Sequence, residues 1–420
     1  MDIREQLAHL RRTVATIDRK YEELLAPALP ANRRVAPVFI EELLSGQVVE
    51  TALGKHFESE KLYARHQRHG SFDISDLIEL PVDQLEQLSG GALKDSHPTR
   101  WAFLDTETTG LAGGSGTYAF LVGIGSIDEA GFRVRQFFMR DYAEEGSMLS
   151  AVAEFLSRFD VLITYNGRTY DAPLLETRFT MNRARTPFAR MEHVDLLHGA
   201  RRLFSLRLRN CRLVNLENEI LGVERDEDIP GEMIPYCFFE YVRTRRALRL
   251  VPVFLHNAID ILSLACLTGV IPNAFRDPEG VRLQHGADLL GLARWLLAAG
   301  RAEEAHRMMR RAIDLGLADA HLFRTLYETG RLEKKLGREA ESVATFIDLT
   351  LSPNAYRGRA WEELARHYER REKNPAMAME CVRAARGIED SDALRVRELR
   401  LKARIDRIGR QPRLKLAGRA

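Results

Sequence analysis

The sequence predicts an α/β domain followed by an all-α domain of repeated helices. Residues 101–275 alternate short apolar, strand-like runs with stretches of helical periodicity, a pattern typical of a mixed sheet flanked by helices. Residues 285–400 are instead dominated by alanine, leucine, arginine and glutamate, all of which favour helix. A chain of 420 residues is long enough for roughly two to three domains.

The first domain is expected to contain five strands. Strand-like runs come first and then alternate with helices, which favours a mixed sheet. Helical periodicity is clearest in residues 147–159, 170–179 and 256–271. The expected strands are WAFLD (101–105), TYAFLVGIGSI (117–127), FRVRQFFM (132–139), DVLITYN (160–166) and MEHVDLL (191–197).

The helical region carries a weak internal repeat. LAAGRAEEA, KLGREAES and REKNPAMAM place Gly300, Gly337 and Asn374 at equal spacings of 37 residues, close to the period of helix-turn-helix repeats. Residues 361–385 resemble a tetratricopeptide unit in the placement of their Trp, Leu-Ala, Tyr and Ala residues. A plain helical bundle is the alternative. We expect the α/β domain at 100–275 and the helical repeats at 285–400.

Two terminal regions flank these domains. Residues 1–99 are expected to be helical or irregular, and residues 401–420 form a basic tail. A heptad-like pattern near the N-terminus fits either one amphipathic helix packed on the protein or a dimerising coiled coil. The tail fits either a solvated end or a nucleic-acid contact. The apolar positions of the heptad-like pattern are Ile3, Leu7, Leu10, Val14, Ile17, Tyr21 and Leu24.

Composition narrows the class of protein. The net charge of +2 identifies no partner. The four cysteines form no CxxC pair, which argues against a structural zinc site or a disulfide framework. The charged N-terminus shows no signal peptide. The most apolar stretch, near residues 289–299, is interrupted by Arg294, so no membrane span is expected. We therefore expect a cytoplasmic protein that does not bind membranes.

Asp105 and Glu107 are the first candidates for chemistry. They stand two positions apart at the end of an expected strand, so their side chains point to the same face. Two such carboxylates repel each other and are costly to bury without a counter-charge. Because hard carboxylate oxygens suit Mg²⁺ or Mn²⁺, the pair predicts a divalent metal site.

The segment DTETTG, which begins at Asp105, resembles the first motif of the DEDD-type 3′–5′ exonucleases, whose fold is ribonuclease-H-like. NGRTYD, ending at Asp171, is similar to the second motif of that family, and HNAID, ending at Asp260, to the third. The resemblance covers residues 98–275. DTETTGL, YNGRTYDAPLL, HVDLLHGARRL, DIPGEMIP and HNAIDILSL together resemble the YprB-like branch of this superfamily, which also tends to carry tetratricopeptide repeats after the nuclease domain.

The resemblance implies a role for each of the four carboxylates. Asp105 is expected to bridge two Mg²⁺ or Mn²⁺ ions. Glu107 and Asp260 would complete one metal site, and Asp171 the other. Two such cations stabilise the attacking and leaving oxygens of an in-line displacement at phosphorus.

His256 is the candidate general base. It stands four residues before Asp260, so both lie on one face of a helix, and histidine can accept a proton near neutral pH. The common family patterns place Tyr four residues before this Asp or His five residues before it, where Leu255 stands here. This departure leaves an alternative, in which His256 only hydrogen-bonds to a carboxylate.

Five further residues are candidates for substrate binding. Thr108 begins a turn with free backbone donors, Asn166 ends a strand, and Tyr170 could stack on a base. Arg207 and Arg209 lie in a locally basic stretch that suits contact with phosphates. The alternatives are a turn residue for Asn166, a core aromatic for Tyr170 and a solvated face for the arginines.

Three neighbouring features have structural interpretations. Asp195 is expected to cap a strand or lie near the groove. Residues 113–116 are rich in glycine but lack the lysine of a phosphate-binding loop, so they predict a flexible turn. Gly123 and Gly125 form too short a pattern for a dinucleotide-binding motif.

These patterns together predict a metal-dependent 3′–5′ exonuclease that hydrolyses phosphodiester bonds at single-stranded DNA or RNA ends. One alternative is a catalytically inactive nucleic-acid-binding scaffold that works through its helical repeats. Another is a structure-selective endonuclease on the same fold. The presence of all four carboxylates favours an active enzyme. The repeats also offer a surface for a protein partner.

Overall fold

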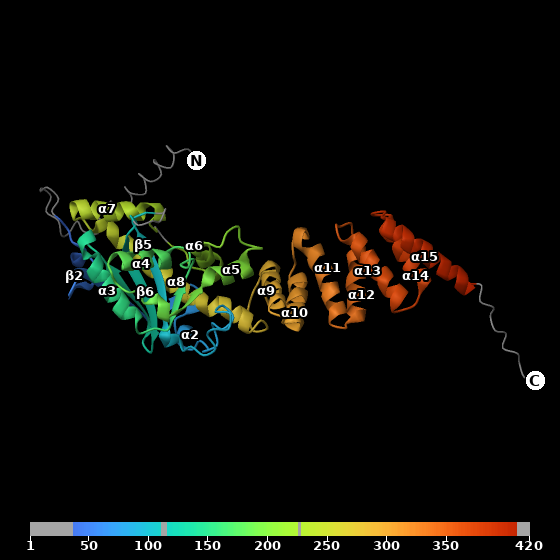
Figure 1. Cartoon of the computed structure of the whole chain (residues 1–420), viewed down its shortest axis with the longest axis horizontal. Coiled ribbons are helices and arrows are strands. Elements are labelled where there is room, and N and C mark those ends of the chain that lie inside the picture. The colour runs from blue at the N-terminus through green and yellow to red at the C-terminus, as the bar shows by residue number, and fades with distance from the viewer. Residues whose placement is uncertain (1–36, 111–115, 226–227, 410–420) are drawn as a thin grey trace, which may run out of the picture. The chain divides into compact units, whose positions relative to one another are not determined.

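The computed structural model describes residues 37–110, 116–225 and 228–409 (Figure 1). The chain divides into two compact units. We call the residues up to Arg201, together with Asn210–Asp277, the α/β unit. Arg202–Arg209 and the residues from Pro278 onward form the helical unit. The heptad-like pattern of residues 3–24 lies outside the described residues.

The α/β unit is built on a seven-stranded mixed sheet in the order β1-β2-β7-β6-β5-β8-β9. The pairs from β1 to β5 along this order are antiparallel, whereas β5–β8 and β8–β9 are parallel. All five predicted strands are present, so the predicted mixed sheet is confirmed. The strands are β1 Gly46–Thr51, β2 Gly54–Ala64, β5 Trp101–Thr108, β6 Ala119–Asp128, β7 Gly131–Phe138, β8 Val161–Thr164 and β9 Glu192–Asp195.

The β1–β2 hairpin corrects the prediction for residues 1–99. Those residues were expected to be helical or irregular, yet β2 pairs with β7 along residues 57–64. The three consecutive residues His56, Phe57 and Glu58 are all buried, so the simple alternation of a half-buried strand is broken. Strand formation here depends on pairing with β7, which is distant in the sequence. A second, smaller hairpin joins β3 Arg68–His69 to β4 Phe72–Asp73.

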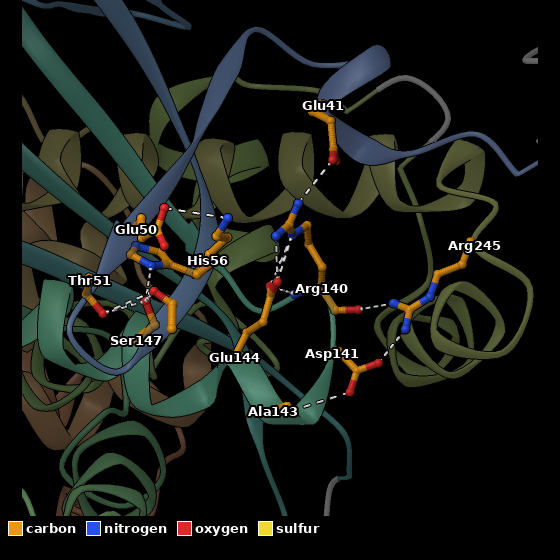
Figure 2. A network of polar contacts seen from close by, with 12 residues as sticks. Glu41, Glu50, Thr51, His56, Arg140, Asp141, Ala143, Glu144, Ser147 and Arg245 are labelled. Carbon is orange, nitrogen blue, oxygen red and sulfur yellow. Dashed lines mark hydrogen bonds and ion pairs between the residues drawn. The ribbon is translucent and has the colours of Figure 1, made fainter.

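Buried polar contacts fasten the hairpin to helix α3, Glu145–Leu156. Figure 2 shows the side chain of Ser147 between those of Thr51 and His56. His56 Nδ1 lies 2.9 Å from Ser147 Oγ, and its Nε2 lies 2.9 Å from Glu58 Oε1. The order Ser–His–Glu is that of a hydrolase triad, but Ser147 and His56 are both 0% exposed. The network is therefore structural.

Arg140 forms a second part of the same network. It binds Glu144 through several hydrogen bonds and reaches Glu41 at 3.1 Å (Figure 2). Arg245 donates to the backbone carbonyl of Arg140 at 2.6 Å and pairs with Asp141. These contacts join the N-terminal part of the described chain to the turn before α3.

Helices cover both faces of the sheet. α3 and α4 pack against one core face, where Phe120 stacks on Phe238 of α7 with ring centroids 4.3 Å apart. Helix α8 packs on β5, β6 and β7. The helices of the α/β unit, apart from α3, are α2 Ser75–Ile78, α4 Asp171–Met181, α5 Leu196–Phe204, α6 Leu213–Leu216, α7 Ile234–Thr244 and α8 Val251–Arg276; the end of α5 enters the helical unit.

Helix α8 is more apolar than the sequence analysis allowed. With its preceding turn, Leu248–Arg276 is long and apolar enough to cross a membrane by length and composition, so the expectation that no such stretch exists was wrong. In the structure, 72% of its most apolar window is buried. Packing against the sheet therefore accounts for its composition, since a core helix passes the same test.

The helical unit consists of successive antiparallel helix pairs, which confirms the predicted all-α region. Gly300 and Gly337 have positive φ angles of 81° and 79° and end the first helix of their pairs. Asn374 occupies the corresponding turn and caps α14 by accepting from the Met377 N–H. The helices are α9 Gly286–Ala298, α10 Ala302–Asp314, α11 Asp319–Lys335, α12 Glu339–Thr350, α13 Arg357–Arg370, α14 Pro375–Arg386 and α15 Asp392–Gly409.

Two predictions about this unit have different outcomes. The identification of the pairs as tetratricopeptide repeats stays a prediction. The predicted basic tail of 401–420 starts inside α15, and its part beyond residue 409 lies outside the described residues.

Candidate active site

Asp105 and Glu107 stand at the C-terminal end of β5. Because β5, β8 and β9 run parallel, their carboxyl ends meet at one edge of the sheet, where open α/β sheets bind ligands. The two side chains share one face of the strand. Glu107 is only 8% exposed. The two carboxylates therefore lie at the edge of the sheet where a ligand can bind, although little of the Glu107 side chain is exposed to solvent.

Two amides hold the Asp105 carboxylate in place. Asn257 of α8 donates from Nδ2 to Asp105 Oδ2 at 2.8 Å. Gln136 of β7 in turn donates to Asn257 Oδ1 at 2.9 Å and to the Phe254 carbonyl at 2.8 Å. Both amides are buried, so their orientation is determined by these bonds. In the sequence, Asn257 stands out only as part of the third motif, and no motif indicates a role for Gln136.

Glycine on β6 allows α8 to approach this site. Gly123 pairs with Asp105 in the sheet. A Cβ atom at Gly123 would lie 2.2 Å from Asn257 Oδ1 and 2.3 Å from Ile261 Cδ1. At Gly125 a Cβ would lie 2.6 Å from Ile261 Cγ2. The two glycines that are too few for a dinucleotide motif thus serve close packing between helix and sheet.

Asp171 begins helix α4 beside the end of β5. Thr106 Oγ1 donates to Asp171 Oδ1 at 2.5 Å, so the strand and the helix are joined at the predicted carboxylates. The negative charges of Asp260 and Asp171 raise the pKa of Asp105, so the three carboxyl groups lie close together. The structure therefore brings together the carboxylates of the three predicted motifs.

Asp260 on α8 is bound by a buried arginine that the sequence analysis missed. Arg225 pairs with Asp260 Oδ1 and donates to Glu217 Oε2 at 2.7 Å. The side chain of Arg225 is 5% exposed and that of Glu217 is 0% exposed. An arginine buried this deeply needs such partners. Its place in a loop between short helices carried no motif that could have revealed it.

His256 lies between two acidic side chains. Its Nδ1 is 2.8 Å from Asp228 Oδ1, and its Nε2 is 3.8 Å from Asp260 Oδ2. Burial by itself lowers the pKa of His256, but the hydrogen bond to Asp228 and the charge of Asp260 outweigh it and raise the pKa above the ordinary value. Asp228, the partner of His256, lies in the DIPGEMIP stretch and was not singled out from the sequence.

Two comparisons with known proteins indicate the family of this chain. A family model described as the RNase_H superfamily matches residues 102–271. The chain is 32% identical over 358 residues to the protein named "Uncharacterized protein YprB" of Bacillus subtilis (strain 168), covering 83% of this chain and 84% of that protein. The chain belongs to the same family as YprB, and its residues 102–271 are a domain of the RNase_H superfamily. The predicted likeness to YprB is confirmed, whereas the DEDD assignment stays a prediction.

Membership of the RNase_H superfamily indicates a nuclease-type hydrolase whose substrate is nucleic acid. Nucleases of this superfamily generally use divalent metal ions. The name of YprB states no activity. The likeness to YprB therefore does not narrow the function beyond that of a nuclease-type hydrolase.

The charges of the site fit such an ion. Burial raises the pKa of Asp105 well above its ordinary range, and the charges of Asp260 and Asp171 raise it further. Burial also raises the pKa of Glu107, with Asp105 adding to the effect, and raises that of Asp171 to about 6. Among the residues that the structure describes, Asp105, Glu107 and Asp171 form no ion pair with Lys or Arg. Crowded carboxylates that lack positive charge suit a hard divalent cation.

The predicted substrate-binding residues fall into two groups. Thr108 donates to the Gly110 carbonyl at 3.0 Å, and Tyr170 is 61% exposed directly before Asp171. Arg207 and Arg209 instead belong to the helical unit. Arg207 donates there to Asp288 at 2.9 Å, so its charge is already balanced. These two arginines therefore belong to a different unit from the carboxylates of the candidate site.

Asp195 has the capping role that the sequence analysis expected. It accepts from the backbone N–H groups of Asn166 at 2.8 Å and Arg168 at 3.2 Å. It also accepts from the N–H of Leu197 at 3.0 Å. Asn166 adopts a positive φ of 65°, which asparagine tolerates better than most residues. These bonds shape the turn between β8 and the helix that begins at Asp171.

Proposed function

We propose that this protein is a metal-dependent 3′–5′ exonuclease that hydrolyses single-stranded nucleic acid ends. One observation carries the proposal: carboxylates from β5, α4 and α8 converge at the carboxyl edge of the sheet, with a histidine–aspartate pair beside them. The resemblance of three sequence motifs to DEDD exonucleases supports the direction of cleavage. The carboxylates are Asp105, Glu107, Asp171 and Asp260.

These four side chains would hold one or two Mg²⁺ or Mn²⁺ ions. When bound, such ions lower the pKa of water and stabilise negative charge on the oxygens around phosphorus. By the family resemblance, Asp105, which Asn257 holds through Oδ2, would be the carboxylate shared by two ions. The count of two ions rests on the family resemblance.

Arg225 acts as a positioning residue for Asp260. It occupies Oδ1 of that carboxylate, which leaves Oδ2 on the side of His256. The fork of Arg225 holds Glu217 through Nε and Nη2, which fixes the plane of the guanidinium. Because Nη2 also donates to Asp260 Oδ1, Asp260 would present the same oxygen to an ion in each molecule. Glu217 balances the remaining charge of Arg225.

His256 takes the proton from the attacking water in this proposal. Asp228 holds the ring through Nδ1, and the other nitrogen, Nε2, then faces the carboxylates. The hydrogen bond to Asp228 also stabilises the protonated ring that forms when the proton is taken. The ring is therefore a general base whose orientation is maintained throughout the reaction.

The exposed Tyr170 offers a ring on which a terminal base can stack. Both DNA and RNA remain candidate substrates. We also propose a cytoplasmic location. The four cysteines are scattered along the sequence and form no CxxC pair, which suits a reducing compartment.

The test is degradation of 5′-labelled single-stranded DNA and RNA by the full chain with Mn²⁺, beside the Asp105→Ala variant. We expect a ladder of products that shorten from the 3′ end, and no ladder with the variant. A circular single strand is the control without ends. Its cleavage would show an endonuclease, and binding without cleavage of any substrate would show an inactive scaffold.

A further inference from the structure

A basic groove on the helical unit offers a second binding site. It is a cavity of about 930 Å³, within the size range of protein pockets that enclose a ligand, and it is lined by side chains of α9, α10, α11 and α13. Its apolar part includes Met309 and Leu332, which are buried, and Leu297, which is 39% exposed. All the lining residues lie within the helical unit.

Five cationic and two acidic side chains line the groove. Both acidic side chains are already paired. Glu328 accepts from Arg324 at 2.7 Å, and Glu363 accepts from Lys334 at 2.9 Å. The surplus charge of the groove is therefore positive, and the pairing leaves other cations to interact with a partner. The five cations are Arg294, Arg324, Arg331, Lys334 and Lys335.

Arg331 and Lys335 carry this surplus. They stand four residues apart on α11, so they share one face of the helix, and both are exposed. Neither forms an ion pair with a carboxylate in the described ranges 37–110, 116–225 and 228–409. Two adjacent cations repel each other unless an anionic group approaches, so this part of α11 favours an acidic partner.

We propose that the groove binds an acidic peptide segment of a partner protein, with one aliphatic side chain of the peptide against Leu297, Met309 and Leu332. The peptide carboxylates pair with Arg331 and Lys335. The residues that line the groove do not favour a nucleic acid strand as its ligand. None of the lining residues is aromatic, whereas proteins that hold single strands stack the bases on aromatic rings. The aliphatic surface formed by Leu297, Met309 and Leu332 also suits an apolar peptide side chain better than a phosphate backbone.

This inference does not rest on the proposed nuclease activity. The residues of the groove belong to a different unit from the carboxylates of the candidate active site. Binding at the groove can therefore be measured with the active site inactivated, and each proposal can fail alone.

The test uses the full chain in EDTA and a fluorescent peptide in which aspartate and glutamate flank a single leucine. We expect binding by fluorescence anisotropy that weakens with salt. The double variant Arg331→Glu, Lys335→Glu should weaken binding at least about tenfold. The matched control, Lys402→Glu with Arg407→Glu, makes the same charge change on exposed positions of α15 outside the groove. It should change binding by less than about twofold.

Two further measurements test the apolar contact and the class of ligand. Replacing the leucine of the peptide by serine should weaken binding, as should Leu297→Ser in the protein. A single-stranded oligonucleotide that binds the groove more tightly than the peptide, and loses this binding in the Arg331→Glu, Lys335→Glu variant, would overturn the proposal. So would a peptide that does not bind, or one that both double variants weaken equally. Circular dichroism checks that each variant is folded, and Arg331→Gln, Lys335→Gln replaces the double variant if charge reversal unfolds it.

Discussion

Two clusters of acidic and histidine side chains in this molecule are alike in composition but differ in charge balance. In the helical unit, ligand atoms of His306, Glu333 and Glu341 all lie within 4.8 Å of one another. There His306 Nε2 is 2.9 Å from Glu333, its Nδ1 is 2.9 Å from Arg338, and Glu333 also pairs with Arg310. Both nitrogens of the ring are therefore occupied and the buried charge is neutralised.

The carboxylates at the end of β5 are not neutralised in this way. Asp105 and Glu107 crowd together with other acidic groups, and the pKa of each is raised by burial and by its acidic neighbours. Arg225 is the cation that the structure places among them, and it is shared with Glu217. Short distances between ligand atoms therefore do not by themselves identify a metal site. A deficit of positive charge is the better criterion, and the four predictions below test it.

The largest effect is expected for Asp105→Asn. We expect hydrolysis to fall by at least about 10³-fold, because several kcal/mol of transition-state stabilisation would be lost with the ion. Binding of Mn²⁺, measured by calorimetry, should be lost as well. The melting temperature without metal should stay the same or rise, because the change removes a charge from a crowded, buried group. His306→Asn is the matched control and should leave Mn²⁺ binding unchanged.

His256→Ala should lower the turnover rate by roughly 10²–10⁴-fold, the range typical of a lost general base. Mn²⁺ affinity should change little, because His256 is not among the proposed ligands. Single-turnover kinetics would measure the first and calorimetry the second. A decrease of less than about threefold would assign His256 a structural role.

Glu333→Gln tests the balanced cluster. Removing the charge leaves Arg310 without its buried counter-charge and weakens the hydrogen bond between Glu333 and His306 Nε2. We therefore expect a loss of about 2–3 kcal/mol in the free energy of unfolding of the helical unit. This is less than for a fully buried pair, because Arg310 is 35% exposed. Denaturant unfolding would measure it. The nuclease rate and Mn²⁺ binding should not change, and a loss of either would contradict the separation of the two clusters.

Gly123→Ala tests the close packing beneath the carboxylates. The added Cβ would displace Asn257 and Ile261, with a cost of about 1–3 kcal/mol in stability and a fall in rate that follows the displaced Asp105. Gly231→Ala is the control, since a Cβ there meets nothing within 4 Å. Thermal unfolding and turnover of the two variants would be compared, and equal behaviour would show that α8 can shift without affecting the site.

The parts of the fold that local pattern determines could be predicted from the sequence. The strands β5 to β9 lie in apolar or alternating runs that are visible in the sequence, and the helix pairs repeat at equal intervals around Gly300, Gly337 and Asn374. The β1–β2 hairpin could not be predicted, because its buried residues His56, Phe57 and Glu58 follow no simple period. β2 forms through pairing with β7, some seventy positions further along the chain, and β1 pairs in turn with β2.

The candidate site shows the same division. Asp105, Asp171 and Asp260 could be found because each belongs to a short motif of its own. Arg225 and Gln136 could not, because their importance lies in partners that are distant in the sequence and adjacent only after folding. The basic stretch around Arg207 had a suggestive composition, but Asp288 already neutralises that side chain.

The apolar composition of α8 has a consequence for synthesis of the protein. All seven strands of the sheet, residues 46–195, precede α8 in the chain, and domains generally begin to fold as they emerge from the ribosome. Until α8 has emerged, the sheet has an uncovered apolar face, and α8 itself would be prone to aggregation before it docks. Asp260 and His256 arrive with this last helix. A nascent chain therefore cannot assemble its proposed catalytic site until its most aggregation-prone segment has been buried.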